Sequence, residues 1–319
     1  MEGIFPACWK DAAISPVPKE GKDLSQPVSY RLIALLCSPA KVLEDIVRDQ
    51  LLSFCIEQGV IPDSQFGFLK GRSTEWQLLS VIEEWHTALD RRSCVHAVFL
   101  DAAKAFDRVD HTVLLSHLAQ IGVVGTSLEW FRSYLTGRRI RVKVQGSLSE
   151  LLPITAGVPQ GSILGPLLFL IYFKDIPSVV DAVCTLFADD TLLYRCDCAG
   201  SRKSPCCSLA SDLVPLTSWA DSSKVKFNAL KSVELCLGAQ PSSESVNLNA
   251  ERIPRQSSTL HLGVVLSHDL KWKEHISRIL QRASGPVYLC KRLAYQHSLP
   301  SGVLRKFFSC FCETKIGIL

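Results

Sequence analysis

The sequence lacks any apolar run long enough to span a bilayer. The longest such run, residues 163–173, is interrupted by a Gly-Pro pair, whereas a membrane-spanning helix needs about 20 consecutive apolar residues. The N-terminus also lacks a secretory signal pattern, because residues 9–11, a Trp, a Lys and an Asp, interrupt it. These absences predict an intracellular protein of the nucleus or cytoplasm, without a membrane partner.

The sequence also has little net charge and no recognised zinc-binding spacing. A formal charge of +4 is too small to indicate a nucleic-acid partner by itself. The 13 cysteines are scattered, and the one cluster does not have the spacing of a zinc finger or zinc knuckle; it comprises Cys196, Cys198, Cys206 and Cys207. We therefore expect free thiols in a reducing compartment, with a zinc site as the less favoured alternative.

The composition is that of a chain with a substantial core. Apolar residues make up 47% and charged residues 21% of the 319 residues, a balance typical of globular domains rather than disordered tails. No internal repeat or convincing linker divides the chain. Basic residues concentrate at 132–143 and again beyond residue 270. Such runs are typical of a solvated face, and a basic nucleic-acid groove needs support from the chemistry.

Two adjacent carboxylates, Asp189 and Asp190, form the most informative local pattern. Apolar and β-prone residues flank them over residues 185–194, which predicts a strand, a two-residue turn and a strand, with the acids at the tip. The ordinary interpretation is a solvated hairpin tip, but a second apolar strand over 95–100 leads into Asp101. If these strands are neighbours, Asp101 and Asp189 face a shared pair of metal ions, which removes the repulsion between adjacent carboxylates.

Apolar periodicity predicts the surrounding elements. We expect amphipathic helices over about 38–59, 74–89 and 114–121, further helices over 128–135 and 209–220, an apolar helix over 167–172, and a basic helical segment from 272 onward. Thr74 and Gln77 fit a capping box. Residues 139–146 alternate between basic and apolar, which predicts a half-buried strand with a positive outer face. Short strands are expected at 225–228 and 233–237, around Lys231, and a further strand at 260–266.

With these motifs in order, the chain resembles the reverse transcriptase domain of non-LTR, LINE-type retrotransposons of the jockey-like kind. The most specific motifs are residues 99–111 (FLDAAKAFDRVDH), 157–162 (GVPQGS) and 187–190 (FADD). The resemblance runs from about Phe5 to the end of the chain. It implies an α+β right-hand polymerase whose palm has an antiparallel sheet with packed helices. Its parts would be fingers (about 1–92), palm with interleaved finger elements (93–275) and the start of a truncated thumb (276–319).

The resemblance also implies which residues carry the chemistry. Asp101, Asp189 and Asp190 would hold two Mg²⁺ ions, with Mn²⁺ as a substitute. Two metal ions about 3.5–4 Å apart stabilise the attacking and leaving oxygens of an in-line displacement at phosphorus, and Mg²⁺ prefers carboxylate oxygens. Lys231 matches a lysine that protonates the leaving pyrophosphate, although a solvated turn lysine is an equally good interpretation.

Further residues would contact the substrates. Phe106 matches the position that rejects a ribose 2′-hydroxyl, its alternative being an ordinary core Phe. Gln160 matches a residue that contacts the incoming nucleotide and the template. Arg31 and Lys19 match finger residues that reach the triphosphate, where cations pair with phosphate oxygens. The expected nucleic-acid contacts are Arg72, Arg138, Arg139, Arg141 and Lys143.

The sequence thus predicts an RNA-directed DNA polymerase that copies an RNA template from a DNA primer with dNTPs. A catalytically silent, nucleic-acid-binding remnant of such an element is the alternative. A two-metal nuclease explains neither the Pro-Gln-Gly loop nor Phe106. Leu32 and Leu69 depart from the family's usual Pro and Arg, and the 319 residues do not include an upstream endonuclease. We therefore expect a fragment of an element's polyprotein or a gene model built over a decayed copy.

Overall fold

The computed structural model describes residues 3–19, 21–196, 205–238, 245–297 and a few positions from 300 to 309, without the side chains of 205–208, 286, 296 and 297. Helices and mainly antiparallel sheets confirm the α+β class. Among the described residues, none of the helices combines the length and the apolar character that crossing a bilayer requires.

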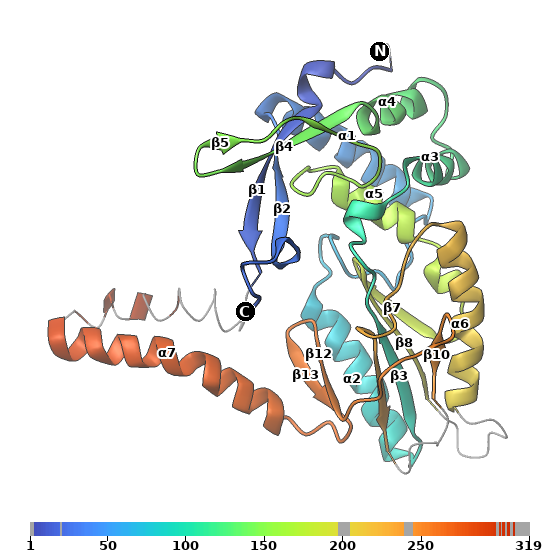
Figure 1. Ribbon diagram of the computed structural model, residues 1–319. Coiled ribbons are helices and arrows are strands. Elements are labelled where there is room, and N and C mark those ends of the chain that lie inside the picture. The colour runs from blue at the N-terminus through green and yellow to red at the C-terminus, as the bar shows by residue number, and fades with distance from the viewer. Residues whose placement is uncertain are drawn as a thin grey trace.

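A four-stranded antiparallel sheet occupies the lower half of the molecule in Figure 1. Its strand order is β7 (Val183–Phe187), β8 (Asp190–Cys196), β3 (Val95–Leu100) and β9 (Val233–Leu237). Every residue of β3 is buried, as its sequence, apolar at every position except His96, predicts for a central strand covered on both faces. The predicted neighbourhood of the Asp101 strand and the Asp-Asp hairpin is therefore confirmed.

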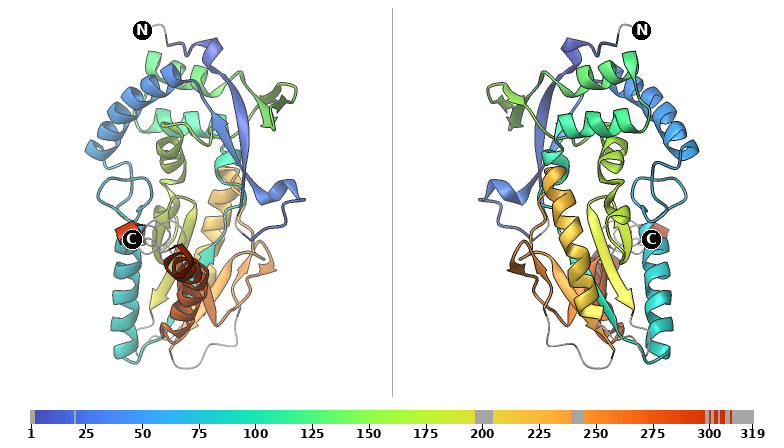
Figure 2. Two further views of the ribbon diagram at one scale, coloured as in Figure 1. Left: turned by 90° about the vertical axis from the view of Figure 1, so that its left-hand side faces the viewer. Right: turned by 90° about the vertical axis from the view of Figure 1, so that its right-hand side faces the viewer.

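The two faces of this sheet pack into different cores, because successive side chains of a strand point to opposite faces. Val98 and Leu193 join the large core that includes residues of α5 (Gly165–Phe173) and α6 (Pro205–Ser222). On the other face, residues of β3 and β8 pack with α2 (Thr74–Asp90). Figure 2 shows α2 and α6 on opposite sides of the sheet. The helices on the two faces therefore support the four-stranded sheet that carries the acids.

A second sheet lies in the upper half of the molecule (Figure 1). Its main path is β2-β1-β4-β5, with β6 beside β4, and β1 pairs with β4 in parallel. Its strands are β1 (Asp11–Pro18), β2 (Tyr30–Leu35), β4 (Arg138–Val144), β5 (Ser147–Leu148) and β6 (Leu152–Ile154). The helices around it are α1 (Ser38–Glu57), α3 (His111–Gln120) and α4 (Gly125–Leu135).

The C-terminal part begins with two small hairpins and ends in a helix that extends away from the sheets (Figure 1). The hairpins are β10 (Asn247–Leu248) with β11 (Glu251–Arg252), and β12 (Ser258–His261) with β13 (Val264–Ser267). The expected basic helical segment is α7 (Lys273–His297). It contacts β13, where the backbone N–H of Val265 donates to Nδ1 of His275 (3.3 Å).

Three local expectations were wrong. The N-cap of α2 is Ser73, whose Oγ accepts from the N–H of Trp76 (3.3 Å); Gln77 instead points into the core and donates to Oγ1 of Thr185 (3.0 Å). Residues 225–228 form a bridge at Phe227 rather than a strand. The single strand expected at 260–266 is the β12–β13 hairpin, because two residues with positive φ, Leu262 and Gly263, reverse the chain.

Candidate active site

Three acidic residues meet at one end of the four-stranded sheet. Leu100 pairs with Thr191 in the β3–β8 ladder, so the next pair in the same register is Asp101 with Asp190. Phe187 pairs with Asp190 across the β7–β8 hairpin, which leaves Ala188 and Asp189 as its two-residue turn. The sheet therefore places one carboxylate on β8, one just beyond β3 and one in the turn between β7 and β8.

The turn that leads into β9 brings a lysine close to Asp101. The β3–β9 pairing ends at Phe99 with Val233, and Lys231 lies two residues before Val233, in that turn. The Nζ of Lys231 lies 4.0 Å from Oδ2 of Asp101, and the Lys231 side chain is 66% exposed. Such an exposed pair contributes little to stability. Its significance is geometric, because it places a proton donor beside the acids.

The surroundings of Asp189 and Asp190 disfavour the ionised form of both carboxyl groups. Burial raises the pKa of Asp189, and the nearby Asp101 carboxylate raises it further. The pKa of Asp190 is raised to about 6, first because protein atoms displace water and then because Asp189 and Asp101 repel its charged form. A cation bound between these groups would relieve the repulsion.

The segment after α6 supports Asp101 from the opposite side. The N–H of Asp101 donates to Oγ of Ser232 (3.2 Å), and its carbonyl oxygen accepts from the N–H of Asn228 (2.9 Å). The Asn228 carbonyl in turn accepts from Oγ of Ser232 (2.8 Å). These bonds attach the loop carrying Lys231 to the end of β3, so the lysine and the acid are fixed as one unit.

Phe106 follows Asp101 by one short loop and is partly buried. Its ring stacks on the buried ring of Phe169 (centroids 4.1 Å apart, 10° between planes). Its other neighbour is Phe68, edge-on at 6.0 Å and 86°. The stacking of Phe106 on Phe169 is a core contact, as expected from the alternative interpretation of Phe106 as an ordinary core residue. The contact with Phe68 brings Phe106 to the surface, since Phe68 is 55% exposed.

The Pro-Gln-Gly loop lies against the same segment. Nε2 of Gln160 donates to Oδ1 of Asp107 (2.7 Å), and the N–H of Val158 donates to the carbonyl of Phe106 (3.0 Å). A Cβ on Gly157 would lie 2.8 Å from the Asp107 carbonyl oxygen, so this approach requires glycine. Gln160 and Phe106, predicted from separate motifs, are thus brought together.

The two finger cations differ in their surroundings. Arg31 is exposed on β2, three residues before Ala34, whose N–H donates to the Gln160 carbonyl (2.6 Å). The hairpin of β1 and β2 therefore brings Arg31 toward the loop of Gln160. Lys19 is turned back onto its own hairpin, where Nζ donates to the carbonyl of Val28 (2.9 Å).

The basic residues of β4 do not form one continuous exposed face. Arg139, Arg141 and Lys143 are exposed, and Arg139 makes an ion pair with Asp11 (2.7 Å). Arg138 is 4% exposed, and its Nε donates to the carbonyl of Tyr134 (2.6 Å). The expectation that Arg138 lines a nucleic-acid surface is therefore wrong, because its guanidinium is buried over the rings of Tyr134 and Phe5.

Arg72 is also engaged with protein atoms. One guanidinium nitrogen donates to the carbonyl of Gln65 (2.8 Å) and another to Oδ1 of Asp63 (2.9 Å). The guanidinium also lies over the ring of Phe66, 5.7 Å from the ring centroid. These contacts brace the loop before α2, and we do not include Arg72 in the nucleic-acid surface.

Sequence reasoning missed three residues that support the site. Asp107 holds Gln160, as described above. Glu44 of α1 is fully buried, and its Oε2 accepts from the N–H of Ile163 (2.8 Å), at the start of α5. Gln65 contacts the 188–189 turn. Gln65 and Asp107 lie inside motifs that were recognised in the sequence. Glu44 bonds to a residue 119 positions away along the chain, and no sequence pattern around Glu44 indicates this contact.

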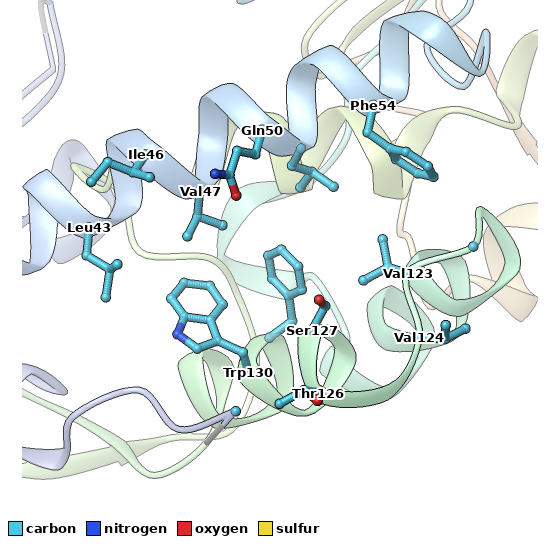
Figure 3. Close-up of a pocket in the computed structure, with 14 residues that line it drawn as sticks. Leu43, Ile46, Val47, Gln50, Phe54, Val123, Val124, Thr126, Ser127 and Trp130 are labelled. Carbon is cyan, nitrogen blue, oxygen red and sulfur yellow. The ribbon is translucent and has the colours of Figure 1, made fainter. Parts of the chain in front are cut away.

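Two other features have the form of a binding site. A cavity of about 480 Å³ between α1 and α4 has a mainly apolar lining without ionisable side chains (Figure 3). His96, Glu234 and Cys236 gather metal-type ligand atoms within 4.8 Å, but Nε of Arg255 also donates to Glu234 (2.9 Å). That arginine already neutralises the buried carboxylate, so we assign no metal to this cluster. For the cysteine cluster expected from sequence, all side chains except that of Cys196 lie outside the described residues.

Comparison with known proteins identifies the family. A family model described as reverse transcriptase (RNA-dependent DNA polymerase) matches residues 17–266. The chain belongs to the reverse transcriptase family. This reverse transcriptase is 33% identical over 290 residues to a probable RNA-directed DNA polymerase from transposon X-element of Drosophila melanogaster, covering 89% of this chain and 32% of that protein.

The polymerase of the mobile element jockey from the same fly is 32% identical over 288 residues, covering 88% of this chain and 31% of that protein. The resemblance to jockey-like non-LTR elements is therefore confirmed. The chain spans about a third of the length of these curated relatives. It is a reverse transcriptase domain of the kind found in LINE-type elements, and members of this family generally use divalent metal ions.

Solved structures support the fold. Apo telomerase of Candida tropicalis, truncated from its C-terminal domain, matches with a TM-score of 0.56 at 14% identity, covering 84% of this chain and 55% of that one. Telomerase of Candida albicans, in complex with a fragment of telomeric RNA, gives a TM-score of 0.56 at 14% identity, with 82% and 46% coverage. At this identity the likeness establishes the fold, and the predicted right-hand polymerase architecture is confirmed.

Proposed function

We propose that this domain is an RNA-directed DNA polymerase that adds deoxynucleotides from dNTPs to the 3′-hydroxyl of a DNA primer on an RNA template. The observation that carries the proposal is the convergence of Asp101, Asp189 and Asp190 at one end of the sheet, with Nζ of Lys231 4.0 Å from Oδ2 of Asp101. The domain bounds expected from sequence, with fingers to about residue 92, palm to 275 and thumb beyond, remain part of the proposal.

The three carboxylates fit divalent metal ions. They are hard oxygen donors of the kind that Mg²⁺ prefers. Burial first, and then repulsion from the neighbouring carboxylates, raises the pKa of Asp190 and of Asp189. We propose that they hold two Mg²⁺ ions, with Mn²⁺ as a substitute. When bound, such a pair polarises the reacting phosphate and stabilises the attacking and leaving oxygens.

The other side chains orient the substrates and handle protons. Lys231 is exposed beside Asp101, and a lysine side chain is a hydrogen-bond donor, so its Nζ can donate a proton to the departing pyrophosphate. We propose that Phe106, five residues after Asp101, lies under the sugar of the bound nucleotide, where a ribose 2′-hydroxyl would collide with its ring. Gln160, held by Asp107, contacts the base pair being formed. Arg31 and, more weakly, Lys19 attract the triphosphate through charge-assisted hydrogen bonds.

The nucleic-acid surface consists of the exposed cations of β4. Arg139, Arg141 and Lys143 lie on one strand, and contacts from such side chains to phosphates are sequence-independent. We propose that this strand binds the backbone of the template–primer duplex. Arg141 and Lys143 carry most of the effect, because Arg139 is shared with Asp11.

Primer extension on a homopolymeric RNA template tests the proposal. Purified chain, an oligo-DNA primer, the complementary dNTP and Mg²⁺ or Mn²⁺ should give elongated primer, and chelation of the metal should stop it. Binding of the primer–template without elongation under both metals would contradict the proposal. That outcome would instead support a catalytically silent nucleic-acid-binding remnant.

A further inference from the structure

Gln65 connects the loop before α2 to the turn that carries Asp189. Its side chain is buried, with 1% exposure. Its Oε1 accepts two backbone N–H groups, from Gly67 (2.8 Å) and from Ala188 (3.0 Å). We propose that Gln65 is a positioning residue: it fixes the 188–189 turn and thereby aims the Asp189 carboxylate. The inference rests on the proposed function of the three acids.

The turn needs such a support because its backbone is strained. Ala188 has a φ of +56°, a region that two-residue hairpin turns usually fill with Gly, Asn or Asp. Ala188 is also buried, with 5% exposure, so its N–H requires a partner. Gln65 supplies that partner from a position 123 residues away. Without it, the turn would lose the bond that stabilises its unusual conformation.

The main chain around Gln65 keeps the amide in place. Residues 64–66 run beside the end of β7, where the N–H of Phe66 donates to the carbonyl of Leu186 (2.8 Å) and the N–H of Leu186 donates to the carbonyl of Ser64 (2.9 Å). A Cβ at Gly67 would lie 2.5 Å from the Ala188 nitrogen. The loop therefore approaches the turn as closely as the backbones allow.

The same loop also reaches the substrate side of the site. Phe68 contacts the edge of Phe106, and Arg72 donates to the Gln65 carbonyl (2.8 Å). One short segment thus touches both the turn of Asp189 and the wall at Phe106. Gln65 is the member of that segment whose side chain bonds directly to the turn.

Manganese affinity of the substrate-free protein tests the proposal separately from activity. Gln65→Met keeps the size of the side chain and removes the acceptor. Mutation of a group that orients a metal ligand typically weakens metal binding 10- to 100-fold. We therefore expect the Mn²⁺ affinity of this variant, measured by electron paramagnetic resonance, to fall about tenfold. We expect the rate constant of dNTP incorporation to fall by a similar factor, with little change in the KM for dNTP.

Gln77→Met is the matched control. Gln77 is equally buried and donates a hydrogen bond to Thr185 on β7, away from the turn. Because its role is in packing alone, its loss should lower the melting temperature. The Mn²⁺ affinity should stay within about twofold of the parent's. If Gln65→Met does not fold, Gln65→Asn, whose shorter side chain withdraws the oxygen from Ala188, provides the second comparison with the same expected result.

Two results would overturn the positioning role. The first is parental Mn²⁺ affinity in whichever folded Gln65 variant is measured. The second is an equal loss of affinity in Gln77→Met, which would indicate general loosening of the hairpin. These results are distinguishable from a failure of the proposed function. If the parent protein binds Mn²⁺ through Asp189 but extends no primer, the Mn²⁺ affinities of the Gln65 and Gln77 variants can still be compared with that of the parent.

Discussion

At the residue scale, single side chains in this domain can combine packing with the roles proposed for them at the site. Phe106 is the clearest example, because its ring stacks on the buried Phe169 and also contacts the exposed Phe68. A change at such a residue affects the fold and the substrate at once. The two effects are separable only when stability and substrate choice are measured together.

Phe106→Val is expected to admit ribonucleotides. The smaller side chain removes the collision with a 2′-hydroxyl, so the ratio of rNTP to dNTP incorporation should rise about tenfold or more. Phe169→Leu disturbs the same ring stack from the buried side and is the control; it should lower the melting temperature without changing sugar preference. An unchanged preference in a folded, active Phe106→Val protein would make Phe106 a packing residue.

His261 is expected to make the domain sensitive to acid. It is buried against Phe99, with ring centroids 4.9 Å apart, and burial lowers its pKa to about 4. An unfolded histidine titrates near 6.5. Between these values the unfolded chain binds the extra proton, so the free energy of unfolding falls as the pH drops.

His261→Phe should remove this contribution. Urea unfolding at pH 7.5 and pH 4.5 should show that the parent loses about 2–3 kcal/mol more stability than the variant over this interval. Other groups titrate in both proteins and cancel in the comparison. Equal losses in the parent and the variant would show that His261 is not held in its neutral form.

At the element scale, strands and helices were predicted best in segments where the apolar residues keep a single regular spacing from end to end. The β7–β8 hairpin and β3 were found this way, together with the acids at their ends. The β12–β13 hairpin was missed because its turn, Leu262-Gly263, lies inside a short, mostly apolar segment with a single Gly. The proximity of Lys231 to Asp101 depends on tertiary structure, and no local pattern specifies a contact across 130 residues.

Strand β4 is expected to contribute affinity rather than sequence choice. Arg141→Ala/Lys143→Ala should weaken binding to an RNA–DNA hybrid equally across sequences. The dependence of log K on log salt should become shallower by about one for each phosphate that the variant no longer neutralises. Arg91→Ala/Arg92→Ala removes the same charge from the end of β3 remote from the acids and should change little. Equal effects in the two double variants would assign the attraction to net charge.

At the scale of the whole molecule, the site is assembled from segments that the two sheets and their helices hold in register. The four-stranded sheet and the turn before β9 supply the acids and Lys231, and β2 of the upper sheet bonds to the loop of Gln160, which in turn bonds to Phe106. Helices pack on both faces of the lower sheet (Figure 2). Catalysis by such a domain depends mainly on holding these groups in place.

The central claim is that three carboxylates make this domain a metal-dependent polymerase, and single-nucleotide incorporation by Asp189→Asn tests it most directly. The variant keeps the size of the side chain but lacks the charge, so incorporation with Mg²⁺ should fall at least about a thousandfold, in line with loss of metal assistance. Its metal-free melting temperature should equal or exceed the parent's, because repulsion with its acidic neighbours is relieved. Asp49→Asn, at an exposed position on α1, should retain parental activity. Incorporation by Asp189→Asn at a rate close to the parent's would contradict the claim.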